Sequence, residues 1–356
     1  MNPIAGIGGR VGLKGSDGEL SRRAKEFGGV SLAPHRTIET LQEIAYANTD
    51  FTIVTYPSEM GESEAVQCGF HPTTLGHIGE ETTAEDTKRA VRELINHGSE
   101  LILFAGGDGT AVDIMGIVGD RFPVLGIPAG VKMHSGVFAI NPKLAGQLCV
   151  NFLKGQTSTQ KMEVLDYDME GNLKLLGYML MPYDRDFVQG SKSYVLSEEG
   201  DEQAIAEEIS ESILDEYAYI IGPGLTAKAV LQKLGLQYTL LGVDVIRNKR
   251  LLIQDANERQ LLDVAARFPT KILVGIVGGQ GFLLGRGNQQ ISPDLVRKLG
   301  KDSLIVVATE RKILSLRGRS LLVDTGDREL DQTLIGYIRV ITGYRRSAVC
   351  RVGRSP

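Results

Sequence analysis

The chain has 356 residues, which is enough for about two domains and a sizeable hydrophobic core. Its net charge of −5 argues against a nucleic-acid or anionic-membrane partner, and no apolar run is long enough for a transmembrane helix. The three cysteines lie far apart and indicate neither a disulfide framework nor a zinc site, and no apolar signal-peptide core is seen, so we expect a cytoplasmic globular protein.

The chain opens with an Asn-Pro pair followed by closely spaced glycines. Asn2 is followed by Gly6, Gly8 and Gly12, a spacing that does not meet the strict dinucleotide fingerprint Gly-x-Gly-x-x-Gly. No Walker-type Gly-Lys-Ser/Thr loop occurs either. We interpret the stretch as a backbone loop for nucleotide phosphates, with Asn2, Gly6 and Gly8 as candidate binding residues.

Helices and strands alternate over the next hundred residues. Apolar spacing predicts a helix over 37–47, a strand over 51–56, a helix from Thr82 to about His97, and a strand over 101–105. This order predicts a doubly wound parallel sheet with its ligands at the carboxyl ends of the strands. The stretch from Pro57 to Glu81 has no clear period and is either a functional segment or a surface loop.

The turn after the strand over 101–105 carries the most informative residues. Gly106, Gly107, Asp108, Gly109 and Thr110 join that strand to an apolar helix. Glycines there let the backbone approach a ligand, and the helix N-terminus favours an anion. A carboxylate among them repels phosphate, so Asp108 makes sense as a base for a hydroxyl or as a magnesium ligand. The five residues therefore indicate phosphoryl transfer, against the alternative of an ordinary capped turn.

A second loop follows the predicted strand over 123–127. Lys132, His134, Ser135 and Gly136 lie in this loop. Lys132 can neutralise a transferring phosphate, while His134 and Ser135 can orient a substrate hydroxyl. The alternative is that Lys132 is solvated and His134 caps a helix.

The character of the chain changes near residue 150, and we place a domain boundary there. Residues 151–323 read as a strand-rich α/β domain that begins with a hairpin over 162–181 and includes a strand over 312–316. Residues 324–356 read as a C-terminal segment, with an amphipathic helix over 328–339 that returns to the first domain, 1–150.

Two further glycine turns complete the candidate site. The first is Gly222–Thr226, and the second, Gly278–Gln290, contains Gln280, Arg286 and Asn288. Arg286 presents a fork of donors suited to phosphate or carboxylate, and the amides suit a ribose or base edge.

Asp244 lies in an apolar strand, where an acid must be paired or functional, and it joins the candidate set. Asp324 and Asp327 either bind a metal or form a turn.

Four glycine boxes together resemble one branch of the ATP-NAD kinase family, which includes the acetoin-catabolism protein X-like proteins. The boxes are Asn2–Gly6, Gly106–Thr110, Gly126–Gly136 and Gly278–Gln290. The Gly106–Thr110 box also resembles that of diacylglycerol and sphingosine kinases, in which its aspartate is the catalytic acid/base residue.

The resemblance implies an oligomeric two-domain kinase, with an α/β N-terminal domain and a mainly β C-terminal domain. It implies a nucleotide in the cleft between them, and Mg²⁺-assisted transfer from ATP to the adenosine ribose 2′-hydroxyl of NAD.

This sequence departs from the family in two places. Related kinases carry an apolar strand just before Asn2, and its absence suggests an unusual start site or a truncated edge. Well-studied NAD kinases also carry an Asn-Glu pair that grips the substrate ribose, and residues 111–165 contain none. The donor, ATP or polyphosphate, and the acceptor therefore stay open.

The leading hypothesis is an ATP-dependent NAD kinase that uses Mg²⁺, works as a homo-oligomer of two or four copies, and takes Asp108 as base. The first alternative is a kinase of another small hydroxyl compound, related to acetoin or ketone metabolism. The second is a nucleotide sensor without catalysis, although such a sensor needs no base.

Overall fold

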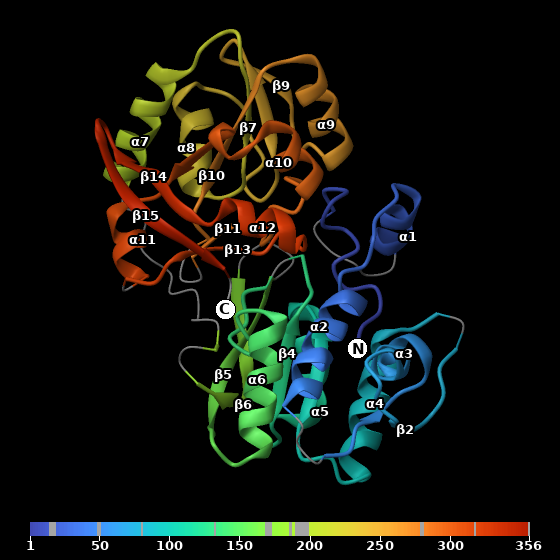
Figure 1. Cartoon of the computed structure of the whole chain (residues 1–356). Coiled ribbons are helices and arrows are strands. Elements are labelled where there is room, and N and C mark those ends of the chain that lie inside the picture. The colour runs from blue at the N-terminus through green and yellow to red at the C-terminus, as the bar shows by residue number, and fades with distance from the viewer. Residues whose placement is uncertain are drawn as a thin grey trace.

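The chain forms two lobes, which lie one above the other in the view of Figure 1. A computed structural model of the protein describes most of its residues, and every structural statement concerns the residues 1–13, 19–47, 51–79, 81–131, 133–167, 173–184, 187–188, 199–277, 281–316 and 318–354. Residues up to Val188 build the N-terminal lobe, and residues from Glu199 onward build the C-terminal lobe.

The N-terminal lobe has parallel strands flanked by helices. β3 (Ile102–Gly106) pairs in parallel with β4 (Val124–Pro128), and β1 (Val54–Thr55) pairs in parallel with β2 (Thr73–Thr74). The helices of this lobe are α1 (Glu19–Glu26), α2 (Ala33–Tyr46), α3 (Glu62–Gln67), α4 (Ala84–Asn96), α5 (Asp108–Val118) and α6 (Pro142–Leu153).

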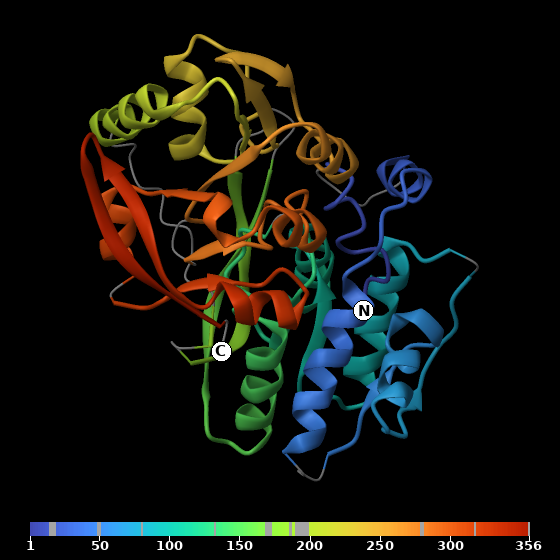
Figure 2. The same cartoon turned by 45° about the horizontal axis from the view of Figure 1, so that its top comes forward.

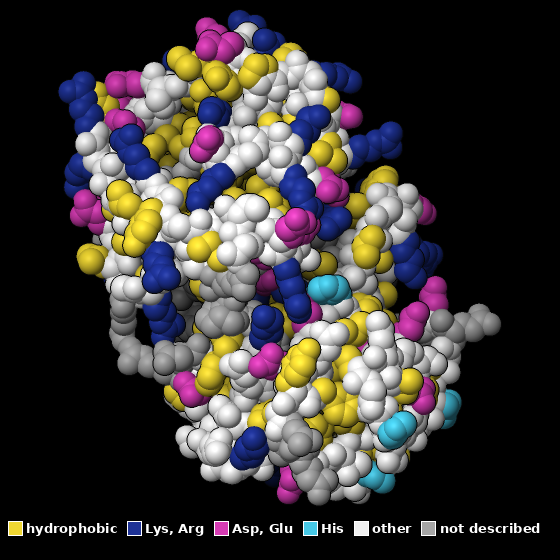
Figure 3. Space-filling model, in the orientation of Figure 1, with side chains coloured by type: hydrophobic (Ala, Val, Ile, Leu, Met, Phe, Trp, Pro, Cys, Tyr) yellow, Lys and Arg dark blue, Asp and Glu magenta, His cyan; other side chains and the backbone are white. Residues whose placement is uncertain are grey.

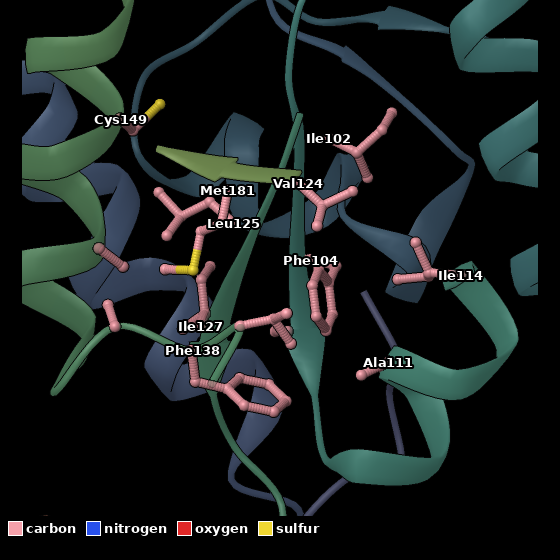
Figure 4. Packing of buried hydrophobic residues seen from close by; sticks show 14 of the residues in the cluster. Ile102, Phe104, Ala111, Ile114, Val124, Leu125, Ile127, Phe138, Cys149 and Met181 are labelled. Atoms are coloured by element: carbon pink, nitrogen blue, oxygen red, sulfur yellow. The ribbon is translucent and has the colours of Figure 1, made fainter. Parts of the chain in front are cut away.

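The helices cover both faces of these strands, which confirms the predicted doubly wound architecture. Figure 4 shows the helix of Cys149 (α6) on one side of the strands and the helix of Ala111 and Ile114 (α5) on the other. α2 lies beside α6 (Figure 2). Phe104 of β3 points toward α5, and its ring centroid lies 5.5 Å from that of Phe138. The alternation of expected strands and helices in the sequence therefore predicted correctly that helices cover both faces of the strands.

The stretch from Pro57 to Glu81 is more regular than expected. It contains the 3₁₀ turn η1 (Ser58–Met60), α3 and β2. Its buried apolar residues in the described part, Met60 and Ala65, are too few to form a period that the sequence alone would reveal.

A long antiparallel hairpin, β5 (Ser158–Tyr167) with β6 (Leu173–Tyr183), follows α6. Its residues Met162, Val164, Met179 and Met181 are buried in the same cluster as β3 and β4. The sequence prediction divides the chain at residue 150, whereas these contacts group the hairpin with the N-terminal lobe.

The C-terminal lobe is built on a nine-stranded mixed sheet with the order β11-β13-β15-β14-β12-β10-β7-β8-β9. Its strands are β7 (Ala218–Ile221), β8 (Asp244–Arg247), β9 (Arg250–Ile253), β10 (Thr270–Gly275), β11 (Phe282–Leu284), β12 (Leu304–Val307), β13 (Leu321–Val323), β14 (Gly336–Gly343) and β15 (Arg346–Arg354). Its helices are α7 (Glu199–Ser212), α8 (Leu225–Lys233), α9 (Glu258–Arg267), α10 (Pro293–Leu299), η2 (Lys301–Ser303), α11 (Glu310–Ser315) and α12 (Arg328–Leu334).

Both faces of this sheet are buried at its central strands β7 and β10, because successive strand residues enter different clusters. Ile220 and Ile272 pack with α9 and α10, while Ile221 and Leu273 pack with α7 and α8. A strand that is apolar on both faces reads as a continuous hydrophobic run, which matches the runs in this half of the sequence.

Two predicted elements of the C-terminal lobe are wrong. Residues 312–316 were expected as a strand, but 312–315 belong to α11 and Leu316 is its C-cap. The Thr309 hydroxyl accepts a hydrogen bond from Lys312 N at 3.3 Å and caps the helix at its N-terminus. The helix expected over 328–339 ends at Leu334, and β14 follows. Residues from Gly336 onward therefore complete the C-terminal sheet, while Arg328 donates to Glu39 of the N-terminal lobe at 3.1 Å.

No helix in the described part of the chain is both long and apolar enough to cross a membrane.

Candidate active site

Asp108 stands at the first position of α5, directly behind the carboxyl end of β3. Gly107 is the N-cap, and Asp108 is only 6% exposed. A Cβ on Gly106 would lie 2.5 Å from the Cβ of Thr110, so the turn requires glycine there. The carbonyl of Gly106 accepts hydrogen bonds from Ala129 N at 3.1 Å and Gly130 N at 2.9 Å. The turn is thereby joined to the loop after β4.

The Asp108 carboxylate is held by backbone amides rather than by a cation. Oδ2 accepts from His134 N at 2.7 Å, and Oδ1 accepts from Ser135 N at 3.0 Å. No described cation forms an ion pair with it. Burial raises the pKa of Asp108 to about 6, against the lowering effect of these hydrogen bonds, and the nearby Asp166 raises it further. A carboxyl group that titrates near neutrality is suited to take a proton from a hydroxyl.

The loop that carries these amides is fastened to the end of β5. The Ser135 hydroxyl donates to Leu165 O at 3.1 Å and accepts from Leu165 N at 3.0 Å. The Nε2 atom of His134 lies 3.2 Å from the hydroxyl oxygen of Tyr167. Gly136 N donates to Glu163 O at 2.8 Å. These contacts fix the position of the two amides that bind Asp108.

The N-terminal glycine loop lies against the same turn. Asn2 N donates to Ala105 O at 2.9 Å, and its Nδ2 atom donates to Thr110 Oγ1 at 3.1 Å. Gly6 has a φ of +83°, and a Cβ there would lie 2.5 Å from Ala129 O. The carbonyl of Gly8 accepts from Leu13 N at 2.9 Å. The structure therefore brings Asn2, Gly6 and Thr110 together around the Asp108 turn.

A cavity of about 210 Å³ lies between the two lobes and is bounded partly by the His134 loop. From the C-terminal lobe come the turn at Pro223 and Gly224, the end of β10, and the turn after β11. The lining residues are Leu13, Gly130, Val131, Met133, His134, Pro223, Gly224, Leu241, Gly275, Ile276, Val277, Arg286, Gly287, Asn288, Gln290 and Lys312. In Figure 3, basic and acidic side chains are interspersed over both lobes on the face shown.

Arg286 links the cavity to the junction of the lobes. Its Nε atom donates to Asp324 Oδ2 at 3.2 Å, and Nη2 donates to Ile140 O of the N-terminal lobe. Arg36 donates to the other oxygen of Asp324 at 2.6 Å. Burial lowers the pKa of Arg286 to about 10 and is opposed by the charge of Asp324. The sequence left Asp324 as either a turn residue or a metal ligand. In the structure it forms ion pairs with Arg36 and Arg286 at the junction of the lobes.

Two sequence profiles match the chain. The ATP-NAD kinase N-terminal domain matches residues 33–157, and the ATP-NAD kinase C-terminal domain matches residues 214–352. This chain belongs to the ATP-NAD kinase family. No curated protein and no solved structure matches it.

Members of the ATP-NAD kinase family are phosphotransferases that use ATP and a divalent metal, and the chain shares this kinase activity. Both matched domains contribute residues to the cavity, because Gly130 to His134 lie in the first match and Pro223 to Lys312 lie in the second. The cavity is thus shared by the two domains that define the family.

Two predicted residues are occupied by structural bonds within the described chain. The side chain of Asn288 accepts from Gly285 N at 2.9 Å and donates to Leu283 O at 2.8 Å. Asp244 is fully buried, with Lys228 Nζ at 2.6 Å, and it does not line the cavity. Lys132 and Gln280 lie outside the described residues.

Three residues near the site were not predicted. Lys312 lines the cavity, Asp166 lies close enough to raise the pKa of Asp108, and Tyr167 contacts His134. Asp166 and Tyr167 lie at the end of β5, which the hydrogen bonds between Ser135 and Leu165 hold beside the Ser135 loop. The sequence gives no local signal for this contact. Lys312 was hidden because its segment was interpreted as a strand.

Proposed function

We propose that the chain is an ATP-dependent NAD kinase that forms NADP by phosphorylating the 2′-hydroxyl of the adenosine ribose. The observation that carries the proposal is Asp108, a buried carboxyl group with a pKa near 6 and no cation partner among the described residues. Membership of the ATP-NAD kinase family supports phosphoryl transfer as the reaction class.

In the proposed reaction Asp108 acts as general base. The 2′-hydroxyl oxygen attacks the γ-phosphorus of ATP, a new O–P bond forms, and the bond to the β,γ-bridging oxygen breaks. Asp108 takes the hydroxyl proton, and ADP leaves with the electron pair of the broken bond. The backbone amides of His134 and Ser135 keep the carboxylate oriented before the substrate arrives.

The glycine turns are proposed to hold the phosphates. A Cβ built on Gly109 meets no atom within 4 Å, so the space over the first turn of α5 is open. Backbone amides at a helix N-terminus bind phosphate in such a space. The proposed binding set comprises Asn2, Gly6, Gly8, Gly106, Gly107, Gly109, Thr110, Lys132, His134, Ser135, Gly136, Gln280, Arg286 and Asn288, with Asp244 acting only by positioning its loop.

The acids near the site fit a magnesium ion. Mg²⁺ is usually bound through one or two carboxylates together with substrate phosphates and water. With Asp108 assigned as the base, Asp166 would provide such a carboxylate, and within the described chain no cluster of three or more His, Cys, Asp or Glu forms an all-protein metal site. When bound, the ion neutralises phosphate charge during transfer.

The test is NADP formation by purified protein with ATP and NAD. Asp108→Asn is expected to lower kcat by about a hundred- to ten-thousand-fold, because the proton acceptor is lost. Asp113→Asn is the matched control, since this residue of the same helix pairs with Lys88 at 3.5 Å. Full activity of Asp108→Asn would remove its role as base.

The acceptor is tested separately with ATP consumption as the readout. If NAD gives no turnover while another small hydroxyl compound does, the NAD 2′-kinase assignment fails and the acetoin-related branch gains support. Replacing ATP with polyphosphate in the same assay identifies the donor.

We also propose a homo-oligomer of two or four copies in a reducing, cytoplasmic setting. Tyr337 and Val349 lie on one face of the β14–β15 hairpin and are 71% and 72% exposed, which favours a contact between copies. Cys68, Cys149 and Cys350 are free thiols. A monomeric mass by light scattering would contradict the oligomer.

A further inference from the structure

The C-terminal side of the cavity contains an ammonium group that the proposed reaction does not use. Lys312 lines the cavity, and its Nζ atom donates to Thr226 Oγ1 at 2.5 Å. No described carboxylate lies within ion-pair distance of it. Burial lowers the pKa of Lys312, with Glu202 opposing this effect. A half-buried cation with one neutral partner is stabilised when an anion binds beside it.

The N-terminus of α8 lies next to this lysine. Gly224 is the N-cap of this helix of nine residues, makes no side-chain cap and lines the cavity. A Cβ on Gly224 would meet nothing within 4 Å, so the space in front of the helix is open. Thr226 accepts from Lys312 and donates to Glu202 Oε1 at 3.1 Å, which connects the ammonium group to the first turn of α8.

Arg286 provides an independent indication of an anion in the same cavity. The residue is 5% exposed, and its buried Nη1 atom has no hydrogen-bond partner among the described residues. Its other bonds go to Asp324 and to Ile140 O. A buried donor without an acceptor is rare in proteins, and a ligand oxygen in the cavity would satisfy it.

We propose that the cavity contains an anion subsite for a phosphate or pyrophosphate group, formed by Lys312 and the N-terminus of α8, with Arg286 as a second cation. The apolar wall of Leu241, Ile276 and Val277 then contacts the uncharged part of the ligand. The inference rests on the proposed function, because the donor and the acceptor of that reaction both carry phosphates. Binding of an anion to the subsite can be measured without turnover.

Calorimetric titration of the full chain with inorganic pyrophosphate tests the subsite. Lys312→Met and Lys312→Gln are expected to weaken binding about tenfold, the value of one charge-assisted hydrogen bond. Lys312→Arg should retain most of the affinity. Lys298→Met, an exposed lysine of α10, is the matched control and should bind as the wild type does. Equal affinity of wild type and Lys312→Met, or no binding by wild type, would overturn the subsite.

Separate titrations with ATP and NAD identify which ligand occupies the subsite. Only the ligand whose phosphates contact Lys312 should lose affinity in Lys312→Met, and unchanged affinity for both contradicts the proposal. NADP formation by the same wild-type preparation separates the two hypotheses. Lysine-dependent binding without NADP formation overturns the acceptor assignment alone, whereas NADP formation with lysine-independent binding overturns the subsite alone. Melting temperatures within a few degrees exclude misfolding as the cause.

Discussion

Two buried aspartates, one in each lobe, show different ways of holding a negative charge. Asp244 is fully buried, and its carboxylate accepts from Lys228 Nζ at 2.6 Å and from the amides of Thr239 and Asp255 at 2.9 Å each. Asp108 is 6% exposed, and its carboxylate accepts from the amides of His134 and Ser135.

The difference between them lies in the cation. Asp244 is neutralised by a lysine that also donates to Ile221 O at 3.0 Å, so the pair joins β7, α8 and β8. Asp108 has no such partner among the described residues, and burial raises its pKa to about 6. A buried acid that the fold leaves without a counter-charge is a better candidate for proton transfer than one that is paired.

The largest expected effect on stability comes from breaking the pair. Asp244→Asn should lower the free energy of unfolding by about 3–5 kcal/mol, because it leaves the Lys228 ammonium buried without a counter-charge. Urea unfolding at pH 7 measures the loss. The double variant with Lys228→Met should recover part of it, since neither charge remains. A loss below about 1 kcal/mol for Asp244→Asn would contradict the structural role.

Asp108→Asn should act on stability in the opposite direction. The folded pKa of Asp108, about 6, exceeds its ordinary value of 3.8, so this group stabilises the fold below pH 3.8 and loses that contribution as the pH rises to about 6. Asp108→Asn has no such pH-dependent loss. Its free energy of unfolding should therefore rise relative to that of wild type by at most about 3 kcal/mol over that range. Urea unfolding at pH 4 and pH 7 tests it. A difference that does not change with pH would refute the explanation.

Smaller effects on stability are expected from substitutions at two glycines of the Asp108 turn. Gly109→Ala should change the free energy of unfolding by no more than about 1 kcal/mol, since a Cβ there meets no atom and alanine favours a helix. It should nevertheless weaken nucleotide binding, because the methyl group enters the proposed phosphate space. Gly106→Ala, whose Cβ would lie 2.5 Å from Thr110, should destabilise the fold instead. Thermal unfolding and ATP titration of both variants distinguish the roles, and unchanged ATP affinity in Gly109→Ala would contradict the proposal.

The smallest effect concerns the neighbour of the base. NADP formation should fall on the acid side with an apparent pKa near 6, as Asp108 becomes protonated. Asp166→Asn should move this limb to lower pH by less than about one pH unit, because a negative charge near Asp108 is removed. The pH dependence of kcat/KM measures the shift. An unchanged limb, or one that moves to higher pH, would exclude Asp166 as a perturbing charge.

Much of the Asp108 region could be predicted from the sequence because its signals are local. An apolar run followed by glycines indicates a buried strand, a turn and a helix, and the structure has β3, the turn and α5 in those places. The doubly wound layers follow from the alternation of such segments. The interpretation of 312–316 as a strand failed because five residues are too few to fix a period, and the Thr309 cap favours α11.

The partners of the buried charges could not be predicted in the same way. Lys228 lies 16 residues before Asp244, and Arg36 lies 288 residues before Asp324. No pattern within a few residues distinguishes a paired acid from an unpaired one, so the sequence placed Asp108 and Asp244 in the same candidate set.

The sequence by itself determined the strand, turn and helix that present Asp108 and the glycines that allow close approach to it, because these depend on neighbouring residues. Only the tertiary structure decided that Asp244 is neutralised by Lys228 while no described cation pairs with Asp108, and that Lys312 and Arg286 line one cavity. The physical reason is that charge pairing and desolvation depend on which distant segments pack together, and this is set by the arrangement of the whole chain.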